Sequence, residues 1–262
     1  SYLRGFELIG EAPYLEAELL ISLDAADRER LGVREIMLDT ARDSICIDHH
    51  ITNTGFARDN VILPGASSTC EVLYGLMDPE KISKETAACL YTGIIHDTGV
   101  FKYSNTSPKT MEIAGVLMGM GIDFGSMIED GFYARSFVQN KLLGLALDQA
   151  QITMEGRCLY TQLESALWTP FTTDSKELDG ITGNIMNTQG VEVGIFLYET
   201  APGEWKLSLR SKKNIDVSRI AAGFGGGGHV KAAGATLTGL AKEEVLSKVL
   251  EAIKDQERVS HG

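Results

Sequence analysis

The stretch Ser44–His50, Ser-Ile-Cys-Ile-Asp-His-His, decides the fold class of this chain. Its apolar residues form a run of strand length that ends at an acid and two histidines. Two further short apolar runs also end at acids: Leu19–Leu23 stops before Asp24, and Glu35–Asp39 stops at its own aspartate. Short apolar runs separated by polar, helix-compatible segments are typical of a parallel α/β sheet, in which ligands bind just beyond the strand ends. We therefore predict three buried strands whose ends carry the functional residues.

Helical patterns follow this predicted sheet, and each begins at a residue suited to an N-cap. The predicted helices cover Ser67–Met77, Ser83–His96 and Pro108–Met120. The last one stops at Gly121, a typical helix terminator, and a mostly helical segment continues from Asp123 to Ala150. We interpret that segment as a connection.

The second half of the chain has a different pattern. Two hairpins are predicted, one turning at Glu155–Arg157 and the other at Ala201–Glu204. A helix-like stretch, Asp179–Gln189, lies between the hairpins, and a final helix covers Lys242–Lys254. The predicted fold is α/β: a mostly parallel-sheet domain at residues 1–125, a helical linker at 126–150 and a smaller α+β domain at 151–262.

Composition limits the class of protein. The chain has 262 residues, 44% of them hydrophobic and 23% charged, and neither a membrane-spanning apolar run nor a signal peptide is recognisable. Its net charge of −12 argues against binding of long nucleic acid, which needs a basic surface, but a small anion can still bind where a metal and a few cations gather. The four cysteines are scattered, as in a reduced cytoplasmic protein. We expect a cytoplasmic protein that binds no membrane.

The histidines are few and occur at junctions between predicted elements. His49 follows a strand, and His96 precedes Asp97 at the end of a helix. Imidazole and carboxylate are the usual ligands of Mn²⁺ or Zn²⁺, and two such ions about 3.5–4 Å apart can cleave a phosphoester. An Asp-His-His sequence alone is also typical of a capped strand end. Because Asp24 and Asp97 lie at further element ends, we favour a metal site.

A glycine-rich loop, Gly223–Gly234, contains four consecutive glycines followed by His229. Glycines allow backbone N–H groups to approach an anion, and we expect a small-residue helix after the loop to present its positive end. Arg210 and Ser211 end the preceding strand and would add a guanidinium fork. The alternative is a flexible loop that binds nothing.

Several motifs occur in an order that resembles a known family. They are Leu23–Asp27, Ile47–His50, Ala66–Thr69, Gly93–Phe101, Arg210-Ser211 and the glycine–histidine loop. Together they resemble the DHH phosphoesterases, in the branch that contains the bacterial oligoribonucleases and the 3′-phosphoadenosine-5′-phosphate (pAp) phosphatases. The resemblance covers almost the whole chain.

The resemblance implies roles for individual residues. Asp24 matches the acid that bridges two Mn²⁺ ions, and His49 and Asp97 match further metal ligands. Asp48 would orient the histidines, and His50 would face the scissile phosphate. The residues that would hold the substrate in the second domain are Arg210, Ser211, Gly227, Gly228 and His229. For His96, a supporting role and a packing role remain open.

One motif of the family has no counterpart here. The family begins with a strand that ends in His-x-Asp-x-Asp and supplies further metal ligands, and nothing in Ser1–Leu23 resembles it. We therefore expect the natural protein to have a segment that this sequence omits. The alternative is a paralogue that kept substrate binding without full metal binding.

The predicted function is Mn²⁺-dependent hydrolysis of very short oligoribonucleotides or of pAp, in a cleft between the two domains of a homodimeric protein. A cyclic di-AMP or linear-dinucleotide phosphodiesterase, an inorganic pyrophosphatase and a catalytically silent nucleotide-binding paralogue are the alternatives. The glycine–histidine loop and Arg210 favour a nucleotide over pyrophosphate.

Overall fold

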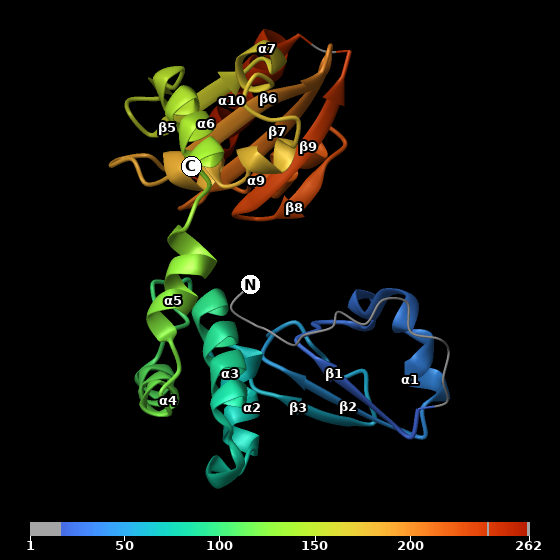
Figure 1. Cartoon of the computed structure of the whole chain (residues 1–262). Coiled ribbons are helices and arrows are strands. Elements are labelled where there is room, and N and C mark those ends of the chain that lie inside the picture. Colours follow the sequence, from blue (N-terminus) through green and yellow to red (C-terminus); the bar gives the residue numbers. More distant parts are fainter. Residues whose placement is uncertain (1–16, 240, 261–262) are drawn as a thin grey trace. The chain divides into compact units, whose positions relative to one another are not determined.

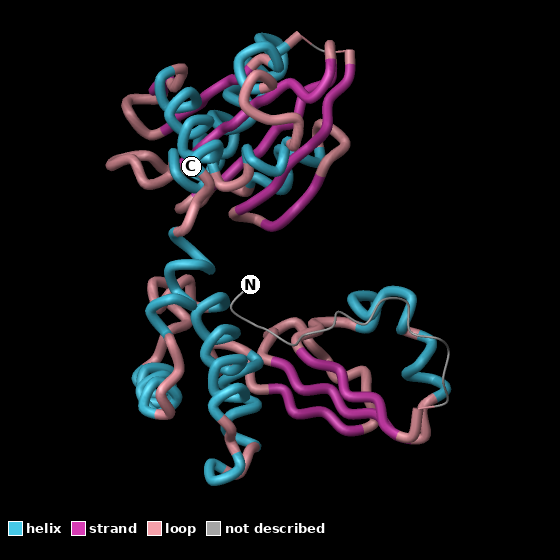
Figure 2. Tube along the Cα trace, in the orientation of Figure 1, coloured by secondary structure: helices cyan, strands magenta, loops and turns pink. Residues whose placement is uncertain are grey.

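The computed structural model describes residues 17–239 and 241–260. By its contacts the chain divides into two compact units, Ser1–Ala134 and Arg135–Gly262, and each contains its own hydrophobic cores. Figures 1 and 2 show a sheet in each unit, with helices packed against it. Within the described residues, no helix is both long and apolar enough to cross a membrane. The predicted mixed α/β architecture is confirmed.

The first unit is built on a parallel sheet of three strands, ordered β1-β2-β3. The strands are β1 (Leu19–Leu23), β2 (Asp43–Asp48) and β3 (Asp59–Ile62), and the helices are α1 (Ile36–Thr40), α2 (Thr69–Leu76), α3 (Lys84–Asp97), α4 (Pro108–Gly119) and α5 (Phe124–Ile128). Shorter helical turns cover Arg28–Arg34, Pro79–Lys81 and Glu129–Tyr133. Leu23 of β1 lies beside Ile47 of β2, so the segments that follow these two strands leave the sheet at the same edge (Figure 1).

Three helices of this unit, α2, α3 and α4, form where the sequence predicts them. Serines at the N-cap positions of α2, α3 and α4 accept hydrogen bonds from backbone N–H groups of the first turn; they are Ser68, Ser83 and Ser107. Helix α3 contacts α2, α4 and α5, and it buries Tyr91, Ile94 and Ile95 almost completely. This helical core holds the last residue of α3, Asp97, in a defined position.

One predicted strand is wrong. Most of Glu35–Asp39 lies in α1, with Glu35 as its N-cap, and the third strand is β3, which the sequence did not reveal. The segment Ile36–Thr40 contains mostly helix-compatible residues, and only Leu38 in it is buried, so it lacks the two buried faces of a central parallel strand. Strand β3 is four residues long, and its first two residues, Asp59 and Asn60, are polar and exposed, which hides it from periodicity.

The second unit contains a six-stranded sheet ordered β4-β5-β6-β7-β9-β8. The strands are β4 (Gln151–Thr153), β5 (Cys158–Leu163), β6 (Val193–Ala201), β7 (Glu204–Ser211), β8 (Gly227–His229) and β9 (Ala232–Thr238). The helices are α6 (Phe137–Asp148), α7 (Ser165–Trp168), α8 (Ile181–Ile185), α9 (Val217–Ala222) and α10 (Lys242–Ser260), with a short turn at Ser175–Leu178. Both predicted hairpins, β4–β5 and β6–β7, are confirmed as antiparallel pairs.

The helix predicted after the glycine loop is wrong. The small residues that follow His229 form strand β9, which pairs antiparallel with β7 and with β8. The glycines make this pairing possible: Gly228 has a φ of 144°, and a Cβ placed there would lie 2.5 Å from the carbonyl oxygen of Ala232. A Cβ on Gly226 would likewise collide with the carbonyl oxygen of Gly234. These glycines therefore permit close backbone packing within a hairpin.

The two faces of the second sheet are covered unequally. One face packs against α9 and α10 in the largest core of the unit. On the other face, Phe196 and Tyr198 of β6 pack in a cluster with residues of α6, α7 and α8. Strand β7 turns Lys206, Ser208 and Arg210 toward this second face, because side chains alternate along a strand and Phe196 is paired with Ser208.

Candidate functional site

The end of β1 carries Asp24 in an unusual backbone conformation. Its φ is 59°, in the left-handed region that aspartate tolerates better than most residues. Its backbone N–H donates to the carbonyl of Ile47 at 3.2 Å, which fixes it against the end of β2. One of its carboxylate oxygens accepts a hydrogen bond from the Thr69 hydroxyl at 2.8 Å. Asp24 is thus held at the common edge of β1 and β2 by contacts on two sides.

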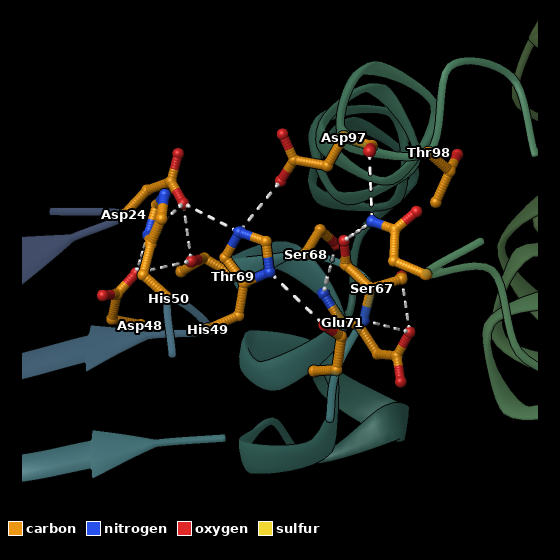
Figure 3. A network of polar contacts seen from close by, with 12 residues as sticks. Asp24, Asp48, His49, His50, Ser67, Ser68, Thr69, Glu71, Asp97 and Thr98 are labelled. Atoms are coloured by element: carbon orange, nitrogen blue, oxygen red, sulfur yellow. Dashed lines mark hydrogen bonds and ion pairs between the residues drawn. The ribbon is translucent and has the colours of Figure 1, made fainter. Parts of the chain in front are cut away.

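His49 points between two carboxylates that come from distant segments (Figure 3). Its Nε2 lies 3.6 Å from Asp24 Oδ1 and 3.7 Å from Asp97 Oδ2. Its Nδ1 lies 3.3 Å from the carbonyl oxygen of Ala66, which can only accept, so Nδ1 carries the proton. The Nε2 lone pair is therefore free on the side where the carboxylates converge. The cluster therefore combines residues from the ends of β1, β2 and α3.

Asp48 is buried beneath the cluster and fixes the second histidine. Its Oδ1 accepts from His50 Nδ1 at 2.8 Å, and its Oδ2 accepts from Asn53 Nδ2 at 2.7 Å. Burial alone raises the pKa of Asp48, but the hydrogen bonds from Asn53 and His50 outweigh it and hold that pKa below its ordinary value. Asp48 is therefore ionised near neutral pH and orients His50 with its Nε2 free. Asn53 was not predicted from sequence.

Asp97, at the end of α3, carries the opposite shift. Partial burial, and then the nearby carboxylate of Asp24, raise the pKa of Asp97. Two acids that share a site repel each other unless a cation lies between them. Ligand atoms of Asp24, His49 and His50 also lie within 4.8 Å of one another. The donor set of imidazole and carboxylate, with one ring oriented through its Nδ1–H, fits a divalent transition-metal ion.

A buried acid supports this cluster from behind. Glu71 is 4% exposed, and its Oε2 accepts hydrogen bonds from the backbone N–H of Ser67 at 3.2 Å, the Ser67 hydroxyl at 2.6 Å and the Thr110 hydroxyl at 2.7 Å. Asn105 donates to the carbonyl oxygens of Ser67 and Asp97, at 2.8 and 3.1 Å. These bonds tie the loop before α2 to α4 and to the end of α3. The contacts of Glu71 with Ser67 are visible in Figure 3.

Sequence analysis missed Glu71, although a signal for it was available. Ser68 and Glu71 have the Ser-x-x-Glu spacing of a capping box. The Ser68 hydroxyl does accept from the Glu71 backbone N–H at 3.0 Å, while the Glu71 carboxylate reaches back to Ser67. The open question on His96 is also answered by contacts: its Nδ1 bonds to the Thr92 carbonyl, and its ring packs at 4.8 Å from Phe132. These contacts favour a packing role, although the charge of His96 also acts on the neighbouring Asp97 and partly offsets the rise in the pKa of that acid.

The predicted substrate-binding residues lie in the second unit and differ in accessibility. Arg210 is exposed and lines a hollow of about 410 Å³ together with Gly227 of β8. Gly228 and His229 are exposed in the same hairpin. Ser211 is different, because it is buried and its hydroxyl donates to the carbonyl of Ile215 at 2.7 Å. Its hydroxyl thus holds the turn after β7, on the sheet face opposite to Arg210.

Comparisons with known proteins agree with this geometry. Residues 4–94 match the DHH family N-terminal domain, and residues 155–256 match the DHHA1 domain. The chain is 30% identical to the bifunctional oligoribonuclease and PAP phosphatase NrnA of Thermus thermophilus, over 90% of this chain and 70% of that protein. It is 28% identical to a probable NrnA of Streptococcus mutans, over 96% and 80%.

A solved structure is similar over nearly the whole chain. It is the crystal structure of an exopolyphosphatase-related protein from Bacteroides fragilis, with a TM-score of 0.82 and 26% identity over 94% of this chain and 74% of that one. The fold of that structure agrees with the two matched domain families and with the similarity to NrnA. The chain belongs to the DHH family of phosphoesterases, with a DHH domain followed by a DHHA1 domain.

Proposed function

We propose that this protein is a metal-dependent phosphoesterase that hydrolyses very short oligoribonucleotides and pAp, and that Mn²⁺ is its ion. The observation that carries the proposal is the convergence of His49 Nε2 with the carboxylates of Asp24 and Asp97, each within 4 Å. The substrate class is supported by the names of the NrnA relatives, which are oligoribonucleases and PAP phosphatases. Hydrolysis therefore takes place, in this proposal, at the end of β1 and β2.

The residues of the first unit have distinct tasks in this proposal. Asp24, His49 and Asp97 would hold the ion, which when bound polarises a phosphoryl oxygen and lowers the pKa of a water. The Ala66 carbonyl keeps His49 in the tautomer that can bind metal, and Thr69 fixes the orientation of Asp24. His50, whose ring is oriented by the bond from its Nδ1 to Asp48, would face the substrate phosphate. The described residues supply donors for one ion, and the second ion of the family site would need further ligands.

The second unit would bind the nucleotide. Arg210 can contact a phosphate with two parallel N–H groups, and the exposed β8 hairpin offers Gly227, Gly228 and the His229 ring beside it. Ser211 would contribute through the turn that it stabilises. A homodimeric assembly stays a prediction of the resemblance, and a cytoplasmic location stays a prediction from the scattered cysteines.

The proposal is tested by hydrolysis assays on chelator-treated protein supplied with Mn²⁺, Mg²⁺ or Zn²⁺. We expect Mn²⁺ to restore turnover of a diribonucleotide and of pAp, and to restore little turnover of pyrophosphate. Cyclic di-AMP belongs in the same series, because preferential turnover of it would reassign the substrate. If no ion produces turnover and elemental analysis finds no bound metal, the proposal is wrong and the protein is a catalytically silent nucleotide-binding protein.

A pair of neighbouring variants tests the site itself. Asp97→Ala should abolish turnover and weaken Mn²⁺ binding by roughly tenfold or more, because it removes a proposed ligand. His96→Ala is the neighbouring comparison: His96 contacts Thr92 and Phe132 and acts on Asp97 only through its charge, so this change should reduce both properties far less than Asp97→Ala. Circular dichroism checks that both variants are folded. Retained turnover in Asp97→Ala would remove Asp97 from the metal site.

A further inference from the structure

One face of strand β7 carries two cations that open onto the same hollow. Lys206, Ser208 and Arg210 alternate along β7 and so point to one side of the sheet. Both Lys206 and Arg210 line the hollow of about 410 Å³. The neighbouring strand β9 contributes only small residues there, among them Ala232 and Gly234, so a ligand can approach the sheet closely.

These two cations have no acidic partner in the part of the chain that the structure describes. Among the described residues, neither Lys206 nor Arg210 takes part in an ion pair or a side-chain hydrogen bond. Some other lysines of the same unit are paired with acids, among them Lys213 with Glu192 and Lys242 with Glu164. In a chain with a net charge of −12, acidic partners are abundant. Two unpaired cations that share one hollow therefore indicate a site for an anionic ligand.

The direction of the site follows from its surroundings. A second hollow, of about 210 Å³, adjoins the first at Ser208 and Arg210 and extends toward α8, where it is lined by the exposed Asp179. That carboxylate disfavours phosphate on the α8 side. On the other side, Lys206 extends the positive charge along β7. An anion bound at Arg210 that continues further should therefore run toward Lys206.

The spacing of the cations sets the size of the ligand. Lys206 and Arg210 are four positions apart along β7, which corresponds to about 13 Å between their Cα atoms, and side chains stand roughly perpendicular to a sheet. A single nucleotide with phosphates at both ends is too short to place one on each cation across that distance. A chain of three or more nucleotides is long enough.

From these observations we propose that Lys206 binds a second, more distant phosphate of an oligoribonucleotide whose first phosphate is held at Arg210. Lys206 thereby sets the preference for chains of three or more nucleotides over dinucleotides and pAp. This inference rests on the proposed function for its substrate class. The hollow that carries it is a property of the second unit alone.

The test compares kcat/KM for pAp and for di-, tri- and tetraribonucleotides in the wild type and in Lys206→Gln. We expect Lys206→Gln to lower kcat/KM for the two longer chains by about tenfold through KM, and that for pAp by less than twofold. The dependence of KM on salt should also weaken for the longer chains, by about 0.7 in the log–log slope for one lost phosphate contact. Lys206→Arg should restore most of the loss. Lys254→Gln removes the same charge from exposed α10 and should change nothing.

Two outcomes would overturn the inference while the proposed function stands: an equal loss for all four substrates, or no loss for any. Failure of the proposed function looks different, because the wild type would then turn over none of them. In that case binding of a fluorescent tetranucleotide to metal-free protein still tests Lys206. Tighter binding by the wild type than by Lys206→Gln supports the inference, and equal binding refutes it.

Discussion

Replacing the buried Glu71 with alanine should destabilise the first unit strongly. The change removes the one oxygen that accepts from Ser67 N–H, the Ser67 hydroxyl and the Thr110 hydroxyl. A buried donor left without a partner costs about 1–3 kcal/mol, and hydroxyls can rotate to other partners whereas the N–H cannot. We therefore expect the free energy of unfolding to fall by about 3–5 kcal/mol.

Glu71→Gln separates the acceptor from the charge. Its amide oxygen can occupy the place of Oε2 and accept the same bonds, so the loss should be about 1–2 kcal/mol. Ser83→Ala is a matched control on the next helix, because Ser83 is an exposed N-cap remote from the cluster and should cost about 1 kcal/mol. We expect the wild type to be the most stable and Glu71→Ala the least stable. The single variants Ser83→Ala and Glu71→Gln should have similar stabilities between these two.

Urea unfolding, followed with two spectroscopic probes, measures the loss in the free energy of unfolding for each variant. Both tryptophans, Trp168 and Trp205, lie in the second unit, so their fluorescence reports on that unit, whereas far-ultraviolet circular dichroism reports on both. Because the units have separate cores, Glu71→Ala should move the dichroism transition of the first unit and leave the fluorescence transition in place. A loss below about 1 kcal/mol for Glu71→Ala, or an equal loss for Glu71→Gln, would refute the reasoning.

Three further outcomes are expected. His229→Ala should mainly raise KM, because the ring is proposed to hold substrate and not metal; steady-state kinetics decide, and an unchanged KM would contradict that role. Gly228→Ala should destabilise the second unit by about 1–3 kcal/mol in urea unfolding, whereas Gly227→Ala, where an added Cβ meets nothing within 4 Å, should be nearly neutral; similar losses would count against strain at Gly228. Burial raises the pKa of the Cys158 thiol to about 12, so iodoacetamide at pH 8 should leave it unmodified in native protein by mass spectrometry, and rapid labelling would contradict its burial.

Local signals in the sequence located much of the candidate site. Apolar runs that end in acids placed Asp24 just after one strand and Asp48 at the end of another, and a serine N-cap placed the helix that ends at Asp97. Both are short-range features, since a strand end or a cap is defined by a few neighbouring residues. The motif order then predicted that Asp24, His49 and Asp97 bind one metal site, which stays a prediction. In the structure the Nε2 of His49 lies within 4 Å of a carboxylate oxygen of each acid.

Other features depended on long-range contacts and could not be read in advance. The sequence by itself determined an α/β protein of two units, the strand ends with their acids and histidines, and a glycine-rich segment beside a basic strand. Only the tertiary structure decided that this segment is a hairpin, that Ser211 turns away from Arg210, and that Glu71 supports the cluster from within. Each of these features depends on contacts between groups that are far apart in the sequence. Such contacts stabilise the protein only in the folded chain, so local sequence patterns do not reveal them.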